Sequence, residues 1–156
     1  MIFKRSRKFE VFSPVDGMYV RQENINDSTY SSKIMGIGCG IYPDSNVISS
    51  PIDGEVIMVF PTGHAVGIKR KDGLEILIHI GIDTVNLKGK GFTTLVKQGG
   101  KVKVGDELVR FDKEKILNND LDPTVVMIFT NSMSFHISMS DKSDKITTRD
   151  VISYVK

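Results

Sequence analysis

The chain has a single cysteine, no tryptophan and no long hydrophobic run. Cys39 cannot form an internal disulfide, and a chain without a disulfide framework is typical of a reducing compartment such as the cytoplasm. The apolar stretches have the length of strands and fall short of the ~20 residues that cross a bilayer. Residues 1–8 are basic but lead into no signal-peptide hydrophobic region, so residues 1–12 are expected to form a solvated N-terminal lead-in. We therefore expect a cytoplasmic protein that does not insert into the membrane.

The chain also lacks a dominant charge. Its net charge of +2 comes from 21 basic and 19 acidic residues spread along the sequence, whereas nucleic-acid-binding proteins gather lysine and arginine on one face. At 156 residues the chain has the length of one domain that can bury a core without disulfides or a structural metal. The sequence therefore argues against nucleic-acid binding and predicts a single domain over residues 13–156.

Short strand-like runs, separated by turn residues, dominate the sequence. Residues 13–20 (SPVDGMYV) return as residues 50–57 (SPIDGEVI), and residues 99–109 have a similar rhythm of short strands around a glycine turn. Because proline fixes φ and Asp-Gly favours a turn, each copy predicts a turn that leads into a strand. The pattern is typical of an all-β sandwich or barrel with one or two short helical turns. Strands are also predicted over 9–12, 38–43, 54–60, 64–70, 74–80, 107–111, 124–130 and 134–139, and helical turns over 113–119 and 95–98.

Two of the three histidines are expected to face each other. His64 and His79 lie at the two outer ends of a predicted β-hairpin, whose turn we expect at residues 70–73. In an antiparallel pair, a loop of even length places both side chains on one face. A four-residue loop sets them directly opposite each other, and a two-residue loop makes them diagonal neighbours. A loop of odd length would separate them.

A pair of imidazoles can accept a transferred group, bind a metal or move protons, and the spacing does not choose among these. Thr62 precedes His64 by two residues, where its hydroxyl can bond to the imidazole and fix its tautomer, although a threonine also suits a strand start. Asp83 can support the histidines electrostatically, but an Asp-Thr pair after a glycine is usually a turn or a helix cap. His136 has no visible partner and is interpreted as structural.

Three segments form a longer and more specific pattern: Thr62-x-His64-Ala65, residues 76–92 (ILIHIGIDTVNLKGKGF) and residues 102–106 (VKVGD). Together they resemble the enzyme IIA domain of the glucose class in the bacterial phosphoenolpyruvate-dependent sugar phosphotransferase system. The resemblance covers the chain from about residue 13 to its end. It implies a duplicated β-sandwich or barrel, in agreement with the internal repeat.

The resemblance also implies roles for individual residues. His79 is then the residue that is transiently phosphorylated, His64 contacts the phosphoryl group, and Thr62 is bonded to His64. Phosphate arrives from the histidine phosphocarrier protein and passes to a sugar-specific IIB domain of a membrane permease, and no cofactor is needed. In some relatives the unphosphorylated form also regulates other proteins, so the resemblance is compatible with such a role here. Relatives commonly have an acidic residue in place of Ile37, which affects the expected partner electrostatics. The implied apolar docking rim consists of Tyr30, Met35, Phe60 and Ile78.

Two other functions were weighed. Zinc metallopeptidases with a duplicated barrel need a His-x-His pair, a further histidine and an aspartate, but this sequence has no His-x-His and no export signal. A biotinyl or lipoyl carrier needs a modified lysine at an exposed hairpin tip, and the chain is about twice too long for one. No metal is required for the predicted chemistry, and we expect His64 and His79 alone to hold zinc only adventitiously.

Overall fold

Residues 9–141 and 144–156, which the computed structural model describes, form three β-sheets, two short helices and three 3₁₀ turns. The strands are β1 (Glu10–Phe12), β2 (Gly17–Val20), β3 (Ile37–Pro43), β4 (Val47–Ser49), β5 (Gly54–Val59), β6 (Ala65–Lys69), β7 (Glu75–Ile80), β8 (Phe92–Thr94), β9 (Lys101–Val102), β10 (Glu107–Phe111), β11 (Val125–Phe129), β12 (Ile137–Met139), β13 (Lys145–Ile146) and β14 (Val151–Val155). The helices are α1 (Ser28–Ser31) and α2 (Lys113–Asn118), and the 3₁₀ turns are η1 (Gln22–Asn24), η2 (Thr84–Leu87) and η3 (Ser132–Ser134). No helix in these residues is long and apolar enough to cross a membrane.

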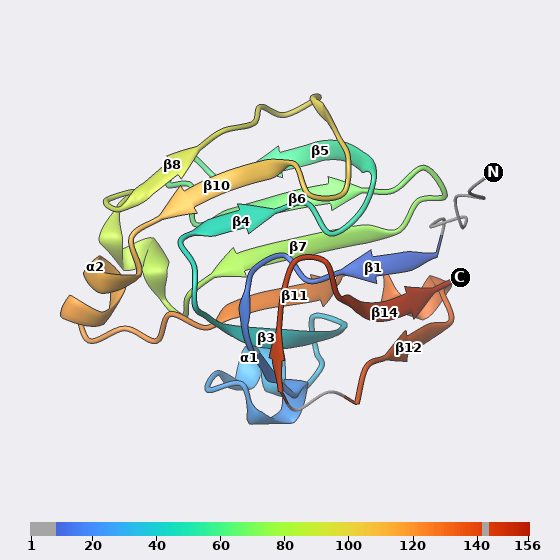
Figure 1. Ribbon diagram of the computed structural model, residues 1–156, viewed down its shortest axis with the longest axis horizontal. Helices are drawn as coiled ribbons and strands as arrows, with labels where there is room; N and C mark the ends of the chain where they lie inside the picture. The colour runs from blue at the N-terminus through green and yellow to red at the C-terminus, as the bar shows by residue number, and fades with distance from the viewer. Residues whose placement is uncertain (1–8, 142–143) are drawn as a thin grey trace.

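The sheets are arranged as a sandwich. An eight-stranded sheet has the order β13-β2-β3-β11-β7-β6-β5-β9, and the two three-stranded sheets, β1-β14-β12 and β4-β10-β8, pack over one of its faces (Figure 1). The large sheet consists of two halves with matching strand order. Counted inward from the two edges, β2 corresponds to β5, β3 to β6, and β11 to β7. The predicted all-β, duplicated sandwich is confirmed.

The two copies of the sequence repeat make the same hydrogen bonds. In the first copy, the Asp16 carboxylate accepts from the backbone amide of Thr148 at 2.9 Å. In the second copy, the Asp53 carboxylate accepts from the backbone amide of Val104 at 2.8 Å. Each repeated turn is therefore held to a later segment of its own half, which closes the sandwich at corresponding places.

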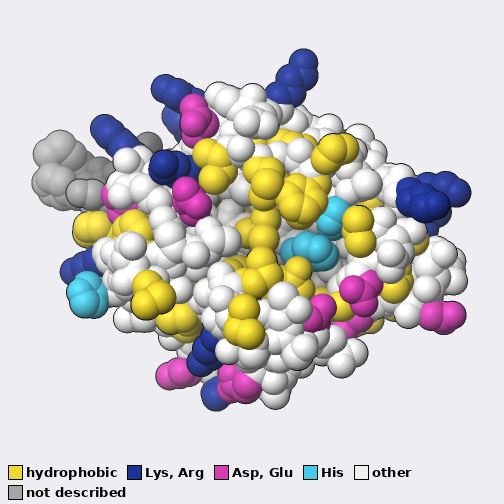
Figure 2. Space-filling model, turned by 180° about the vertical axis from the view of Figure 1, so that it is seen from behind, with side chains coloured by type: hydrophobic (Ala, Val, Ile, Leu, Met, Phe, Trp, Pro, Cys, Tyr) yellow, Lys and Arg dark blue, Asp and Glu magenta, His cyan; other side chains and the backbone are white. Residues whose placement is uncertain are grey.

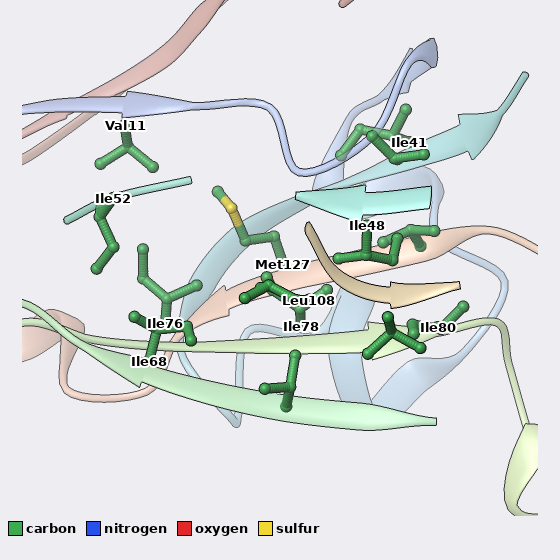
Figure 3. Packing of buried hydrophobic residues seen from close by; sticks show 14 of the residues in the cluster. Val11, Ile41, Ile48, Ile52, Ile68, Ile76, Ile78, Ile80, Leu108 and Met127 are labelled. Carbon is green, nitrogen blue, oxygen red and sulfur yellow. The ribbon is translucent and has the colours of Figure 1, made fainter. Parts of the chain in front are cut away.

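Alternation along the central strands separates the core from the outer face. On β7, Ile76, Ile78 and Ile80 point into the core, where they meet Met127 of β11 (Figure 3). Each fully buried isoleucine contributes about 1.5–3 kcal/mol relative to an exposed one. The residues between them, His79 among them, therefore point to the face that the three-stranded sheets leave uncovered.

The structure changes several expected boundaries. Residues 95–98 are irregular chain and turn, so the predicted helical turn is wrong there; the backbone amide of Leu95 continues the pairing of β8 by donating to Leu108 at 2.9 Å. The helix predicted over 113–119 is present as α2, whereas α1, β4, β8, β13 and β14 were not predicted. Residues 10–12 of the expected lead-in form β1 and pair with β14, and residues 1–8 lie outside the described part of the chain.

Candidate active site

The hairpin of β6 and β7 has a loop of odd length. Ala65 lies opposite His79, and the backbone amide of Arg70 donates to the carbonyl of Leu74 at 2.8 Å, which leaves residues 71–73 as a three-residue loop. The predicted turn of even length is therefore wrong. Strand alternation alone would place His64 on the opposite face from His79.

The two histidines nevertheless face each other. The ring centroids of His64 and His79 are 5.0 Å apart and the rings are nearly perpendicular, at 75°. His64 precedes β6 and follows Gly63, whose φ of 72° belongs to a turn closed by the Gly63 amide and the Phe60 carbonyl at 2.8 Å. Glycine adopts this φ without strain. A Cβ atom on Gly63 would also approach Phe92 to 3.1 Å. The turn therefore brings His64 to the side of His79.

Hydrogen bonds engage the Nδ1 atom of each imidazole. His79 Nδ1 donates to the Gly81 carbonyl at 2.6 Å, and His64 Nδ1 is bonded to Oγ1 of Thr62. Because a carbonyl only accepts, His79 carries its proton on Nδ1 and has a lone pair on Nε2. Within residues 9–141 and 144–156, neither Nε2 atom has a hydrogen-bond partner. Nε2 of His79, on the half-buried ring, therefore remains available to a ligand.

Gly81 is needed where it is for steric and conformational reasons. It has a φ of 78°, and a Cβ atom there would collide with Thr84 and lie 3.1 Å from the carbonyl oxygen of Asp122. The hydroxyl of Thr84 donates to the carbonyl of Ile80 at 2.5 Å, which fixes the end of β7. The Gly81 carbonyl, which accepts the hydrogen bond from His79 Nδ1, therefore has a fixed position.

Burial favours the neutral form of both imidazoles. It lowers the pKa of His64 to about 4, with a smaller contribution from His79. Burial also lowers the pKa of His79, while its bond to Gly81 and the carboxylates of Asp27 and Asp83 raise it. His64 is only 3% exposed, whereas His79 is half-buried. The site thus presents an accessible, neutral His79 with a second neutral imidazole beside it.

Apolar side chains surround the histidine pair. The ring of Phe60 meets His64 edge-on at 5.1 Å, and the ring of Tyr30 lies 5.6 Å from that of His79. Met35 is partly buried and packs against the cluster that contains Tyr30. Figure 2 shows two histidine side chains together in a hollow among hydrophobic side chains, with acidic side chains at its border and the third histidine far away.

One residue of the predicted docking rim is misplaced, and another, Tyr30, is largely buried, with 8% of its surface exposed. Ile78 is fully buried in the core, because adjacent residues of a strand point to opposite faces and His79 takes the outer one. Leu77, also half-buried, is the neighbour that shares the outer face with Gly67 and Lys69 of β6. The alternation visible in the sequence was enough to place Leu77, and not Ile78, on the outer face with His79.

Two acidic residues act on the site through charge. Asp83 is exposed, has a φ of 59° and makes no hydrogen bond to either histidine within the described residues. Asp27 was missed by the sequence analysis: its carboxylate accepts from the Thr29 amide at 2.9 Å as the N-cap of α1, and it raises the pKa of His79. An Asp before Ser-Thr predicts a helix cap. Only the fold places that cap near His79.

The third histidine and the metal question are separate from this pair. His136 is exposed, and its backbone amide donates to the carbonyl of Lys156 at 2.7 Å. In the described part of the chain, no group of three or more histidine, cysteine, aspartate or glutamate side chains is arranged to hold a metal ion. His64 and His79 offer two nitrogen ligands, which is half of a tetrahedral zinc shell.

Fold and site together define an all-β, duplicated sandwich that carries a facing pair of histidines. The sequence profile of one family matches residues 9–135, and that family is described as phosphoenolpyruvate-dependent sugar phosphotransferase system, EIIA 1. The chain belongs to this family. It is a phosphotransferase-system component of the enzyme IIA type, with the phosphoryl-carrier role of that component.

Individual relatives agree with this assignment. The chain is 45% identical over 150 residues to the PTS system glucose-specific EIIA component of Staphylococcus epidermidis, covering 96% of this chain and 86% of that protein. It is 48% identical over 122 residues to the protein of the same name from Staphylococcus aureus, covering 78% and 74% of the two chains. The solved structure of glucose permease IIA from Mycoplasma capricolum is similar with a TM-score of 0.88 and 34% identity, over 98% of both chains.

Proposed function

We propose that this protein carries its phosphoryl group on Nε2 of His79, receiving it from the histidine phosphocarrier protein and passing it to a sugar-specific IIB domain. The observation that supports this is the unpartnered Nε2 of His79, on a half-buried ring whose Nδ1 is already bonded to Gly81. His64 is too deeply buried to be the acceptor, with an exposed fraction of 3%.

The proposed step exchanges one phosphorus–nitrogen bond for another. The lone pair of His79 Nε2 forms a bond to phosphorus while the bond between phosphorus and the donor histidine breaks, and the leaving nitrogen keeps its electron pair. The Nδ1 proton stays in its bond to Gly81, where the carbonyl stabilises the positive charge that develops on the ring. Phosphoryl transfer depends mainly on such positioning and charge stabilisation.

His64 supports the transferred group without bonding to it covalently. When the Thr62 hydroxyl donates to Nδ1 of His64, the proton of the neutral imidazole lies on Nε2. That Nε2–H then donates to a phosphoryl oxygen. Its ring lies 5.0 Å from the ring of His79, so one group on His79 is within reach.

The apolar hollow suits protein partners that exclude water from the contact. Tyr30, Met35 and Phe60 border it, and Leu77 takes the place of the buried Ile78. We place the exchange in a glucose system, because the relatives from Staphylococcus bear the name glucose-specific. The cytoplasmic location stays a prediction. Binding of regulated target proteins by the unphosphorylated form stays a prediction.

The proposal is tested by intact-mass measurement after incubation with phosphoenolpyruvate, the first enzyme of the system and the phosphocarrier. We expect one added phosphoryl group, labile in acid and stable in base as a phosphoramidate is, mapped to His79. A folded His79→Gln protein should stay unlabelled, while His136→Gln, changed at the exposed histidine, should be labelled fully. Full labelling of folded His79→Gln would overturn the assignment.

A further inference from the structure

The ring of a tyrosine whose hydroxyl has no hydrogen-bond partner in the described part of the chain packs beside the ring of the proposed acceptor. The ring of Tyr30 is 5.6 Å from that of His79, at an interplanar angle of 50°. Its position is fixed by a buried cluster that includes Ile82, Val126 and Ile128. Within residues 9–141 and 144–156 the Tyr30 hydroxyl makes no hydrogen bond. Its oxygen is nevertheless in contact with solvent. The hydroxyl is therefore free to bond to something that enters the site.

The hydroxyl belongs to the same electrostatic environment as the reactive ring. The carboxylates of Asp27 and Asp83 act on both the Tyr30 hydroxyl and the His79 imidazole. Together with burial, which has the larger effect, they raise the pKa of Tyr30 to about 12. The phenol therefore keeps its proton at physiological pH and can act only as a neutral donor or acceptor.

A phosphoryl group on His79 would enter a site that is poor in positive charge. In the described part of the chain, the charged side chains that act on His79 are Asp27 and Asp83, both acidic, and burial lowers the pKa of His64, which leaves it neutral before the phosphoryl group arrives. A phosphoryl dianion has three peripheral oxygens, and His64 supplies one N–H donor. The remaining oxygens need donors, and water is the only alternative to a protein group.

We propose that the Tyr30 hydroxyl donates a hydrogen bond to the phosphoryl group on His79, which makes Tyr30 a catalytic residue in addition to a part of the docking surface. This inference rests on the proposed phosphorylation of His79. Because the hydroxyl has no hydrogen-bond partner among the described residues, a phosphoryl oxygen on His79 displaces no protein bond when it accepts from the hydroxyl. A bond from a neutral donor to a charged oxygen is shorter and stronger than a bond between neutral groups. No covalent bond of Tyr30 is made or broken.

The test compares Tyr30→Phe with Tyr154→Phe. The first variant removes only the hydroxyl and keeps the ring in its cluster, and the second changes a tyrosine that is 50% exposed on β14. Each phosphoprotein is titrated by ³¹P NMR, and its equilibrium with the phosphocarrier is measured. We expect Tyr30→Phe to be labelled on His79, but with a raised phosphoryl pKa and an equilibrium shifted toward the phosphocarrier by about tenfold. Tyr154→Phe should match the wild type in both measurements.

The possible failures are distinct from one another. If the phosphoryl pKa and the equilibrium are unchanged in Tyr30→Phe, the hydroxyl has no such role, although His79 remains the carrier. A slower exchange with an unchanged phosphoryl pKa and equilibrium would show that Tyr30 acts in docking alone, and would also overturn the inference. If wild-type His79 takes up no phosphate, the proposed function fails and this inference fails with it.

Discussion

Thr62 and His64 are joined by a hydrogen bond between Oγ1 and Nδ1 inside the turn that precedes β6. The turn is closed by the Gly63 amide, which donates to the Phe60 carbonyl at 2.8 Å. A short side chain on a fixed turn thus sets both the orientation of the imidazole and the ring nitrogen that carries the proton.

Replacing Thr62 with valine removes this bond and keeps the shape of the side chain. We expect Thr62→Val to slow phosphoryl transfer to the IIB domain by about tenfold, since His64 is then free to place its proton on Nδ1. Single-turnover kinetics measure the effect, with Thr93→Val on the exposed face of β8 as the control. Equal rates for the two variants would show that Thr62 does not set the tautomer.

Substitution of His64 separates the two half-reactions. His64→Gln should still accept phosphate from the phosphocarrier, because Nε2 of His79 and its bond to Gly81 are unaffected. Donation to the IIB domain should be strongly impaired, because the transferred group loses the donor that supports it as the bond to His79 breaks. Rapid-quench measurement of both directions decides this. Lost acceptance with intact donation would contradict the roles given to the two histidines.

The histidine pair shows how far local pattern reaches. The strands of the hairpin were predicted from the sequence and the two rings do face each other, but the loop parity used to predict the facing rings was wrong. The rings meet because Gly63 has a positive φ, and nothing in the period of the strand reveals this. The error at Ile78 was avoidable, since alternation with His79 was visible. The resemblance, which matched positions along the chain, took no account of which face each one occupies.

Long-range pairing was beyond the sequence reasoning. Asp27 contributes to the site only because α1 packs near β7, and the repeat of residues 13–20 at 50–57 predicts a duplication without its strand order. The two-residue strands β9 and β13 have too few residues to show any periodicity. They exist as strands because β9 pairs with β5 and β13 pairs with β2. Tertiary contacts, not local preference, define such elements.

Charge at the apolar border should weaken docking without unfolding the protein. Phe60→Glu places a carboxylate where a partner must exclude water, at the cost of apolar contact worth about 25 cal/mol per Å². We expect slower transfer from the phosphocarrier at an unchanged melting temperature. Met133→Glu, at a fully exposed residue of η3, is the surface control. A stable Phe60→Glu protein with unchanged kinetics would place the docking surface elsewhere.

A substitution at Ile78 should have the opposite result. Its side chain is fully buried, so Ile78→Ala removes core packing and should lower the free energy of unfolding by about 2–5 kcal/mol. Transfer kinetics of the folded fraction should stay near those of the wild type. Denaturant titration together with single-turnover transfer separates the two effects. Normal stability with impaired docking would return Ile78 to the docking surface.

Acid should destabilise the protein through His64. The unfolded imidazole binds a proton near its ordinary pKa of 6.5, whereas the folded one does so only near 4. Between these values the unfolded state binds more protons, so stability falls as the pH falls from 6.5 to 4, by up to about 1.4 kcal/mol for each unit. Urea titrations at several pH values across this range should show that the free energy of unfolding of His64→Gln falls less steeply with falling pH. The same slope in both proteins would exclude His64 as the source.

Zinc should bind the isolated protein weakly and compete with phosphate. His64 and His79 leave two positions of a tetrahedral zinc shell to water, and Asp83 has no hydrogen bond that directs its carboxylate toward either ring within the described residues. A partner that offers a carboxylate can complete the shell, so a metal found at the site does not by itself define a metalloenzyme. The proposed phosphoryl site is Nε2 of His79, the atom that zinc would also use, so phosphorylation should displace the metal. Calorimetric titration of zinc, with transfer assays in chelator, tests this: nanomolar affinity together with loss of transfer in chelator would restore the metalloenzyme hypothesis.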